Sequence, residues 1–437
     1  MRITSFKAAL AAAAAGGLAV AGLGAVPALA ATVVVVPCGV GHLSTAISTA
    51  VSGEVLQLNQ SCAYVLHAAL PDVTVPLTLE GHSTISRSTA GATPHFSLLT
   101  VGAGGALTTD DIDFVNGEAN LYGGAIDGAS GPVTVHGGIF SQNKSGEYGG
   151  AIYNGDGLTV IGATFTGNTA PSYYGGAIYN DAPALITGST FTSNTAGYGG
   201  ALYDGAGTVA LNDTFIDNTA AVDGGAIDVG EDTTTVDVGN FFGNSAEYGG
   251  AIVADGGDLT LNHGYFKQNS ASTYGGAVYN SSDTVALRNT TFTGNTSAEY
   301  GGAIYNEDVM TVSTTTATGN SAEYGGAVYN EDSLTLTGGS FQKNTADYGG
   351  GLENDYQATV GTTTFQQNSA TGAGGGIYGD SGSTLGLGYS TVTHNQAPPG
   401  EGGGIYNDGT VTLTGSTITS NLTNNCSPVM SVAGCTG

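Results

Sequence analysis

Residues 299–308 read EYGGAIYNED, and residues 323–332 read EYGGAVYNED, with a single exchange of isoleucine for valine. The Gly-Gly pair inside this segment recurs along the chain. Its first glycine stands at positions 123, 149, 175, 199, 224, 249, 275, 301, 325, 349, 374 and 402. Ten of the eleven intervals are 24–26 residues long, and the last is 28. Self-similarity at such a period is typical of solenoids, whose units stack on one another.

An asparagine forms a second marker that stays in phase with the Gly pair. In nine of its twelve occurrences the residue three positions earlier is phenylalanine, as at Phe140 and Phe292. Stacked units would place these phenylalanines in one internal column. They would place the asparagines in another, where each amide can bond to the next unit. An unpaired buried polar group costs about 1–3 kcal/mol, so we expect a structural ladder of Asn143, Asn168, Asn194, Asn218, Asn244, Asn269, Asn295, Asn320, Asn344, Asn368, Asn395 and Asn421.

Each unit has the composition of short strands joined by turns. In residues 149–168, the segments GGAIYN, LTVIG and ATFTGN are separated or bounded by Gly, Asn and Asp. Val, Ile, Thr, Tyr and Phe are typical of strands, and Gly, Asn and Asp of turns. A unit of this size cannot bury its apolar face alone. We therefore predict an all-β parallel β-helix, a solenoid of about 12 regular coils spaced about 4.8 Å apart.

The first 30 residues have the features of a secretory signal. Arg2 and Lys7 precede an apolar run that ends at Ala28-Leu29-Ala30, a small-residue cleavage site. No run of about 18 apolar residues follows, so no transmembrane helix is predicted. The expected location is secreted or extracellular, including association with a cell surface.

The regions that flank the repeats are predicted to close the ends of the solenoid. The predicted divisions are a signal peptide at 1–30, an N-terminal cap with irregular coils at 31–121, the repeats at 122–421 and a C-terminal cap at 422–437. A short capping helix is expected from the spacing of Leu43, Ala46, Ile47, Ala50 and Val51. Two locally paired cysteine sets in an exported chain indicate disulfides, here Cys38 with Cys62 and Cys426 with Cys435.

The charge of the chain is strongly negative. Loss of the leader removes Arg2 and Lys7, leaving five basic and 35 acidic residues and a formal charge of −30. Binding to nucleic acid depends on neutralising phosphates with Lys and Arg, so nucleic acid is excluded as a partner. Cationic partners or a divalent metal suit such a surface better.

The GGAI and FxxN motifs, recurring together and in phase from Tyr122 to Asn421, resemble the polymorphic outer membrane protein repeats of bacterial autotransporter adhesins. The resemblance implies a right-handed, pectin-lyase-like β-helix that is displayed outside the cell and used for attachment. It therefore favours a non-catalytic, adhesin-like or cell-envelope module that contacts a glycan or a surface protein. The sequence does not indicate an oligomeric state, and no cofactor is required.

A polysaccharide lyase or glycoside hydrolase of the same fold is the alternative. Lyases that resemble this fold use an Arg or Lys base beside carboxylates, and the only arginines after the leader are Arg87 and Arg288. The hydrolases need converging aspartates near a histidine, and Asp110, Asp111 and Asp113 form the only dense trio. We interpret this trio as a solvated turn, which makes an enzyme the less favoured reading.

Two tyrosine columns follow from the repeat. One tyrosine precedes the Gly pair in nine of the twelve units, and another follows the Ile or Val position. If that Ile points inward, alternation sends the second tyrosine outward. Two interpretations remain open, a stabilising cross-strand ladder and a contact surface for a sugar or protein. The candidate surface residues are Tyr153, Tyr179, Tyr203, Tyr279, Tyr305 and Tyr329.

Two columns of acids accompany the tyrosines in three successive units. Like charges about 4.8 Å apart repel by roughly 0.9 kcal/mol per pair in water. Ca²⁺ bridging carboxylates on successive coils would relieve this repulsion, whereas solvated acids that keep the surface soluble are the other interpretation. The candidate calcium ligands are Glu299, Glu323 and Asp347 in one column and Glu307, Glu331 and Asp355 in the other.

Overall fold

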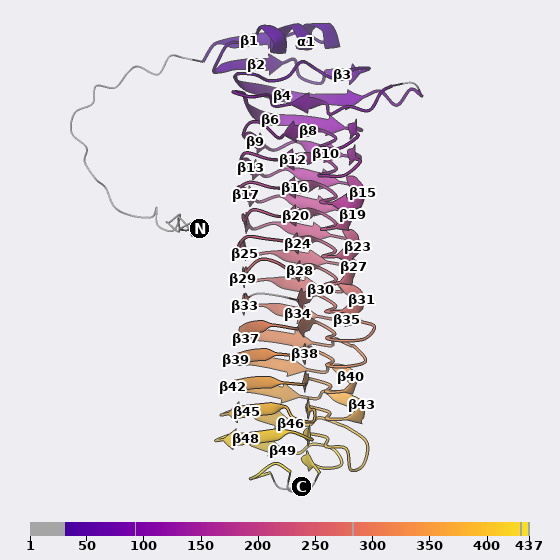
Figure 1. Ribbon diagram of the computed structural model, residues 1–437, viewed down its shortest axis with the longest axis vertical. Coiled ribbons are helices and arrows are strands. Elements are labelled where there is room, and N and C mark those ends of the chain that lie inside the picture. The colour runs from indigo at the N-terminus through magenta and orange to yellow at the C-terminus, as the bar shows by residue number, and fades with distance from the viewer. Residues whose placement is uncertain (1–30, 92, 282–283, 429–430, 436–437) are drawn as a thin grey trace, which may run out of the picture.

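The computed structural model describes residues 31–91, 93–281, 284–428 and 431–435. Within these ranges the chain is a parallel β-solenoid of about sixteen turns with one short helix (Figure 1). The predicted signal peptide, residues 1–30, lies outside the described residues. The parallel solenoid expected from the repeat is confirmed, but the sequence-based count of coils was too low for the solenoid as a whole.

The longest sheet has 26 strands and explains the difference in coil count. Its N-terminal strands carry no Gly pair, yet they pair in parallel register with the repeats that follow. Its members are β1 (Val33–Val36), β2 (Glu54–Leu58), β3 (Ala63–Leu66), β4 (Pro76–Arg87), β6 (Ala106–Val115), β9 (Val133–His136), β10 (Ile139–Ser141), β13 (Leu158–Ile161), β14 (Thr164–Thr166), β17 (Ala184–Thr187), β18 (Thr190–Thr192), β21 (Thr208–Leu211), β22 (Thr214–Ile216), β25 (Thr234–Asp237), β26 (Asn240–Phe242), β29 (Leu259–Asn262), β30 (Tyr265–Lys267), β33 (Thr284–Arg288), β34 (Thr291–Thr293), β37 (Val309–Thr318), β39 (Ser333–Gln342), β42 (Gln357–Gln366), β45 (Thr384–Gly388), β46 (Thr391–Thr393), β48 (Thr410–Thr414) and β49 (Thr417–Thr419).

A sheet of 14 short strands, which we call the tyrosine sheet, carries the Ile-Tyr-Asn segments. Its members are β5 (Leu99–Thr100), β8 (Ile126–Gly128), β12 (Ile152–Asn154), β16 (Ile178–Asn180), β20 (Leu202–Asp204), β24 (Ile227–Val229), β28 (Ile252–Ala254), β32 (Val278–Asn280), β36 (Ile304–Asn306), β38 (Val328–Asn330), β41 (Leu352–Asn354), β44 (Ile377–Gly379), β47 (Ile405–Asn407) and β50 (Cys426–Ser427). Equivalent residues pair coil by coil, as Ile152 does with Ile178 and Tyr153 with Tyr179.

The third side of the solenoid consists of an eight-stranded sheet and a two-stranded sheet. The first contains β7 (Glu118–Ala119), β11 (Lys144–Ser145), β15 (Thr169–Tyr174), β19 (Thr195–Tyr198), β23 (Thr219–Asp223), β27 (Ser245–Tyr248), β31 (Ser270–Tyr274) and β35 (Thr296–Ser297). The second contains β40 (Thr345–Tyr348) and β43 (Ser369–Ala373). These strands lead toward the Gly-Gly turns, and five of them, β15, β19, β27, β31 and β40, end on the tyrosine that precedes the pair.

Phenylalanine rings form the expected column inside the solenoid. From Phe140 to Phe292, successive rings stack with centroids 4.6–5.0 Å apart, and each ring is fully buried. The column is interrupted at Ala317, which pairs with Phe292 on one side and Phe341 on the other. Stacking at this spacing follows directly from the separation of neighbouring strands.

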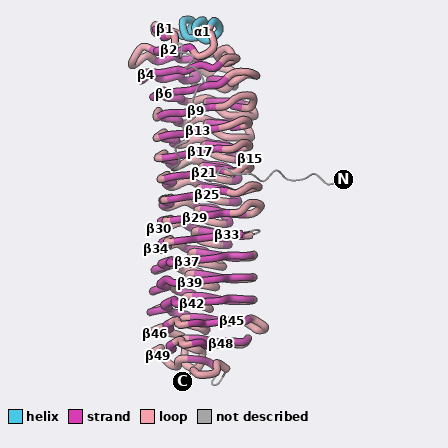
Figure 2. The backbone as a smooth tube through the Cα atoms, turned by 90° about the vertical axis from the view of Figure 1, so that its left-hand side faces the viewer, coloured by secondary structure: helices cyan, strands magenta, loops and turns pink. Residues whose placement is uncertain are grey.

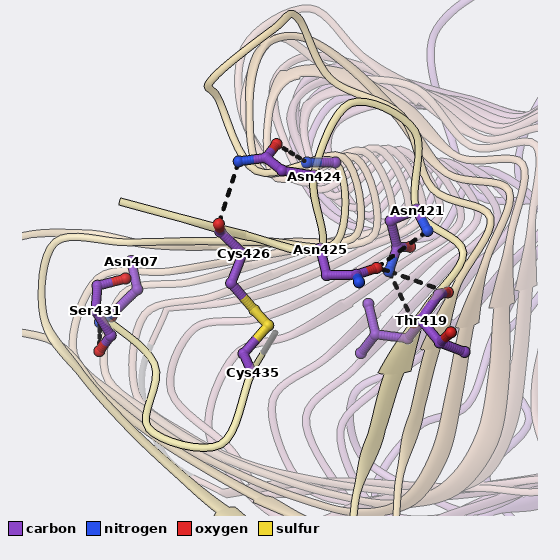
Figure 3. The surroundings of a disulfide bond; sticks show 10 residues. Asn407, Thr419, Asn421, Asn424, Asn425, Cys426, Ser431 and Cys435 are labelled. Carbon is purple, nitrogen blue, oxygen red and sulfur yellow. Dashed lines mark hydrogen bonds between the residues drawn. A yellow bond between two sulfur atoms is a disulfide. The ribbon is translucent and has the colours of Figure 1, made fainter. Parts of the chain in front are cut away.

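The asparagine of the FxxN motif bonds in the same way in coil after coil. Asn295 Nδ2 donates to the carbonyl oxygen of Phe266 at 3.2 Å and to Asn320 Oδ1 at 3.0 Å. The backbone N–H of Asn295 donates to the same Oδ1 at 2.9 Å. The twelve asparagines thus form a continuous ladder, buried until Asn421, which bonds to Asn425 in the C-terminal cap (Figure 3).

Substituting Asn295 with alanine is expected to lower the free energy of unfolding by about 1–3 kcal/mol. The change removes the oxygen that accepts both the backbone N–H and the Nδ2 of Asn269, which are buried. Urea denaturation measures the loss. Asn421→Ala, at the half-exposed end of the ladder, is the matched control and should have the smaller effect. Equal effects at the two positions would contradict a buried ladder.

The ends of the solenoid are covered as expected. Helix α1 (Val40–Thr49) lies across the N-terminal end, contacts β1 and β3, and buries Leu43 and Ile47 (Figure 2). Val51, expected on its apolar face, follows the helix and is 59% exposed, because α1 ends before that residue. Both predicted disulfides are confirmed, Cys38–Cys62 with Cα atoms 5.5 Å apart and Cys426–Cys435 with 6.3 Å. Among the described residues, no helix has the length and apolar character needed to cross a membrane.

Candidate binding surface along two tyrosine columns

The two tyrosine columns run side by side on one edge of the solenoid. The outer column consists of the tyrosines that precede the Gly pairs, and the inner column of those in the tyrosine sheet; together we call them the tyrosine strip. The chain turns between the two columns at the Gly pair. Gly149 has φ +60°, and a Cβ there would lie 2.0 Å from the carbonyl oxygen of Ile152. Only glycine fits this turn, so the repeated pair brings the two tyrosines together.

Outer rings pack across inner rings of the same and neighbouring coils. The centroids of Tyr174 and Tyr203 are 4.6 Å apart, and those of Tyr300 and Tyr329 are 4.8 Å apart. Within the inner column, Tyr179 and Tyr203 stack at 5.2 Å with an interplanar angle of 2°. The strip is therefore two rings deep.

This layering corrects the expectation that the inner tyrosines present open faces. Tyr279, Tyr305 and Tyr329 do point away from the core, but they are only 9%, 5% and 7% exposed because outer rings cover them. Tyr153, Tyr179 and Tyr203 are half-buried. The rim available to a partner belongs chiefly to the outer column, where Tyr122 and Tyr348 are each 37% exposed.

Carboxylates hold the hydroxyl groups of the covered tyrosines. Glu307, Glu331 and Asp355 each accept a hydrogen bond from the tyrosine of the preceding coil, which are Tyr279, Tyr305 and Tyr329 respectively. Burial, followed by these carboxylate contacts, raises the pKa of all three phenols far above the usual range. The phenols therefore remain protonated donors across the physiological pH range.

These hydrogen bonds can stabilise the negative charges of the inner acid column, Glu307, Glu331 and Asp355, without calcium. The outer acids, Glu299, Glu323 and Asp347, are exposed, and the hydroxyl of Thr371 donates to Asp347. In the described part of the chain, no three His, Cys, Asp or Glu side chains form a group that could hold a metal ion. Calcium binding along either column stays a prediction.

The strip is interrupted at Asp223 and Asp228, which replace both tyrosines of one coil. They pair in register with Tyr198 and Tyr203 of the preceding coil. Asp228 is 1% exposed, and its pKa is raised well above the usual value by burial and then by Asp255 and Asp223. Burial likewise raises the pKa of Asp223 to about 7. This interruption of the strip therefore contains carboxyl groups that remain protonated near neutral pH.

A second interruption opens a pocket. Glu353 replaces the inner tyrosine between Tyr329 and Tyr378, and Ala373 replaces the outer tyrosine after Tyr348. The resulting cavity has a volume of about 300 Å³ and is lined by Tyr324, Tyr348, Glu353, Tyr378 and Asp380. Burial is the main cause that raises the pKa of Glu353 to about 9, with Asp355 adding to it.

A second amide ladder was missed in the sequence. The asparagine that ends each GGAIYN segment is buried and bonds to its equivalent, as Asn306 Nδ2 does to Asn330 Oδ1 at 2.8 Å. Asn330 continues in the same way to Asn354. An asparagine five residues after the first glycine in seven of the twelve units was the signal that could have revealed it. This ladder supports the strands that carry the inner tyrosines.

The dense aspartate trio does not form the expected turn. Asp110, Asp111 and Asp113 lie within β6, which bends at Asp111 with φ +52°. Asp113 Oδ1 accepts the backbone N–H of Ile139 at 2.9 Å, and Asp111 lies 3.7 Å from His82. Both side chains of the Asp111–His82 pair are at least half exposed. Arg87 forms an ion pair with Glu118.

Comparisons with known proteins agree with this architecture. The family described as the right-handed beta helix region matches residues 125–295 and 249–426, which together cover more than half of the chain. Neither the curated proteins nor the solved structures give a match. The parallel coils, the internal phenylalanine column and the family match lead to one assignment: this chain is a member of the right-handed β-helix family.

Proposed function

We propose that the protein is a non-catalytic, secreted module of the polymorphic outer membrane protein repeat type. In this proposal it is adhesin-like or located at the cell envelope, and it binds a glycan along its tyrosine strip. The observation that carries the proposal is the two-layer arrangement of the strip. Inner rings are fixed by stacking and by carboxylates, and outer rings such as Tyr348 form a rim along the solenoid.

The chemistry of the strip suits a linear saccharide. A tyrosine ring offers an apolar face for a sugar ring, and its hydroxyl offers a polar tip for the sugar hydroxyls. Because the inner rings are already ordered, little side-chain entropy is lost on binding. The net charge of −30 after removal of the leader repels polyuronates and favours neutral or amino-bearing glycans.

The first test is a glycan array on which neutral, amino-bearing and uronic polymers are scored for both retention and product release. Retention without release is expected. Released oligosaccharide would instead establish the polysaccharide-cleaving alternative and overturn the non-catalytic proposal.

Replacing the outer residues Tyr300, Tyr324 and Tyr348 together by serine is expected to weaken glycan binding at least tenfold. Truncation of aromatic residues at an interface centre typically costs about 2 kcal/mol or more, and each 1.4 kcal/mol is tenfold in affinity. Tyr389, which is 71% exposed at the bend between β45 and β46, provides the matched control. Isothermal titration should show Tyr389→Ser binding like the unaltered protein. Equal losses in the two variants would refute the strip as the binding surface.

A further inference from the structure

The pocket at the second interruption occupies the place of a missing tyrosine. In the two preceding coils, the inner tyrosine donates to an acid one coil further on, from Tyr305 to Glu331 and from Tyr329 to Asp355. Glu353 stands in the next position of this column, and the next acid after Asp355 is Asp380. A tyrosine at position 353 would thus direct its hydroxyl to Asp380. Its absence leaves both a ring-sized space and an acid without that donor.

Two carboxyl groups in this space have oxygens without partners. Glu353 is 5% exposed, and its Oε2 accepts the backbone N–H of Gly325 at 3.1 Å. Within the part of the chain that the structure describes, Glu353 Oε1 and both side-chain oxygens of Asp380 accept no hydrogen bond from the protein. These oxygens are not among the enclosed side-chain atoms that lack a partner, and both residues line the open pocket. They are therefore available to a ligand that supplies hydrogen-bond donors.

The walls of the pocket favour a donor with positive charge. Tyr324, Tyr348 and Tyr378 line it with Glu353 and Asp380, and no basic residue does. The faces of aromatic rings attract ammonium groups, and so do carboxylates. The volume of about 300 Å³ lies at the lower end of small-molecule sites. It suits a single ring with its substituents.

We propose that this cavity, the Glu353 pocket, binds an amino-sugar residue of a glycan, with the sugar ring in the space of the missing tyrosine ring and the ammonium group between Glu353 and Asp380. The proposal rests on glycan binding by the tyrosine strip and adds the class of sugar that it selects. The tyrosine faces account for the ring of the ligand, and the two acids account for its amine.

The experiment compares chitosan oligosaccharides with fully N-acetylated oligomers of the same length, using isothermal titration at pH 7. The two differ in the acetyl group, which turns each amine into an uncharged amide. The intact protein should bind the free amine at least tenfold more tightly. Equal affinity for the two oligomers, or no binding of either, would overturn the proposal.

Glu353→Tyr is the decisive variant because it completes the tyrosine column. The new ring should fill the pocket and donate to Asp380, so the variant should be at least as thermally stable as the unaltered protein. Its preference for the free amine should disappear. The matched control is Asp408→Asn, which removes one acid from the corresponding position of the next coil, outside the residues that line the pocket. That variant should keep the preference within about twofold of the unaltered protein.

Proton release provides an independent measurement. An ammonium group beside Glu353 lowers the pKa of its carboxyl, so binding at about pH 5.5, where the free sugar amine is already largely charged, should expel protons. Titrations in two buffers of different ionisation enthalpy count these protons. Glu353→Gln, which keeps the shape of the side chain, should abolish the proton release. Unchanged release in this variant would show that Glu353 is not part of the site.

Three outcomes separate the pocket from the strip. If both oligomers bind equally and Glu353→Tyr has no effect, the pocket proposal fails while binding by the strip stands. If Glu353→Tyr abolishes binding and serine replacements of Tyr148, Tyr174 and Tyr198, which lie on the strip outside the pocket, do not, the pocket stands and the strip fails. If a lysine-rich peptide binds more tightly than chitosan and Glu353→Tyr removes that binding, the amine comes from a protein and the amino-sugar assignment is wrong.

Discussion

Acidification from pH 8 to pH 5 is expected to raise the thermal midpoint of this protein. Burial raises the pKa of Glu353 to about 9 and that of Asp213 to about 7, and it also raises the pKa of Asp228. In the unfolded chain these carboxyls lose their protons near pH 4. Between pH 4 and the raised values, the native state therefore binds more protons than the unfolded state.

The direction of the effect follows from this difference. Stability falls with rising pH wherever the native state holds the extra protons, by up to about 1.4 kcal/mol per pH unit for each such group. The contribution is fully present below about pH 4. It is lost as the pH rises through about 7 for Asp213 and about 9 for Glu353. The combined effect of several groups makes this the largest change that we expect.

Thermal unfolding followed by circular dichroism at constant ionic strength measures the pH dependence. Glu353→Gln and Asp213→Asn should each flatten it, because an amide keeps an oxygen acceptor for the backbone N–H of Gly325 or Ser189. Asp156→Asn, at an exposed position, should leave the slope unchanged. The thermal midpoint could instead be highest at pH 8, or its pH dependence could be the same in both buried variants as in the unaltered protein. Either result would show that these carboxyls are ionised in the native protein.

Phe241→Ala is expected to cost about 3–5 kcal/mol of unfolding free energy, at the upper end of that range. Phe241 is fully buried, and the rings of Phe215 and Phe266 stack on its two faces with centroids at 5.0 and 4.6 Å. Removing the ring leaves a cavity that rigidly spaced coils cannot close. It also removes two stacking contacts, each of which contributes about 0.5–1.5 kcal/mol.

Phe292→Ala is the comparison that isolates stacking from cavity formation. Phe292 is equally buried but stacks only on Phe266, because Ala317 occupies the next place in the column. Its loss should be smaller than that of Phe241 by about one stacking contact, roughly 0.5–1.5 kcal/mol. Guanidinium denaturation of both variants measures the two losses of unfolding free energy. A loss at Phe241 below about 1 kcal/mol would mean that the column repacks.

The repeated motifs were sufficient to predict the coil and the phenylalanine column, because each depends on the residue at one position and on its equivalent one period later. Both disulfides were predicted separately, from the local pairing of the cysteines at the two ends. The early coils were expected only as irregular ones and were not counted, because the segments of β4 and β6 carry no Gly pair, although both pair in parallel register with their neighbours. A periodic marker identifies only the coils that contain it.

The candidate site was predictable only in part. Alternation along a strand gives the direction of Tyr305 but not the outer rings that cover it, since these come from the turn at the Gly pair. The Glu353 pocket arises because a tyrosine ring is missing from the column. In the sequence alone, such a departure from the repeat looks the same as a neutral substitution. Asp213 illustrates the same limit, because its burial at a bend of the long sheet has no pattern within one coil.

The asparagine ladder has a direction, and this has a consequence for how the length of the molecule is set. In every coil the backbone N–H and Nδ2 donate to the oxygen of the asparagine that follows, so each coil requires an acceptor from its successor. At the last rung Asn425, only four residues further on, supplies that oxygen to Asn421. The cap thus takes the place of one more coil and ends the array at Asn421. For this ladder, one unit more or fewer would leave the bonding of the last rung unchanged and would alter the length of the solenoid by about 4.8 Å.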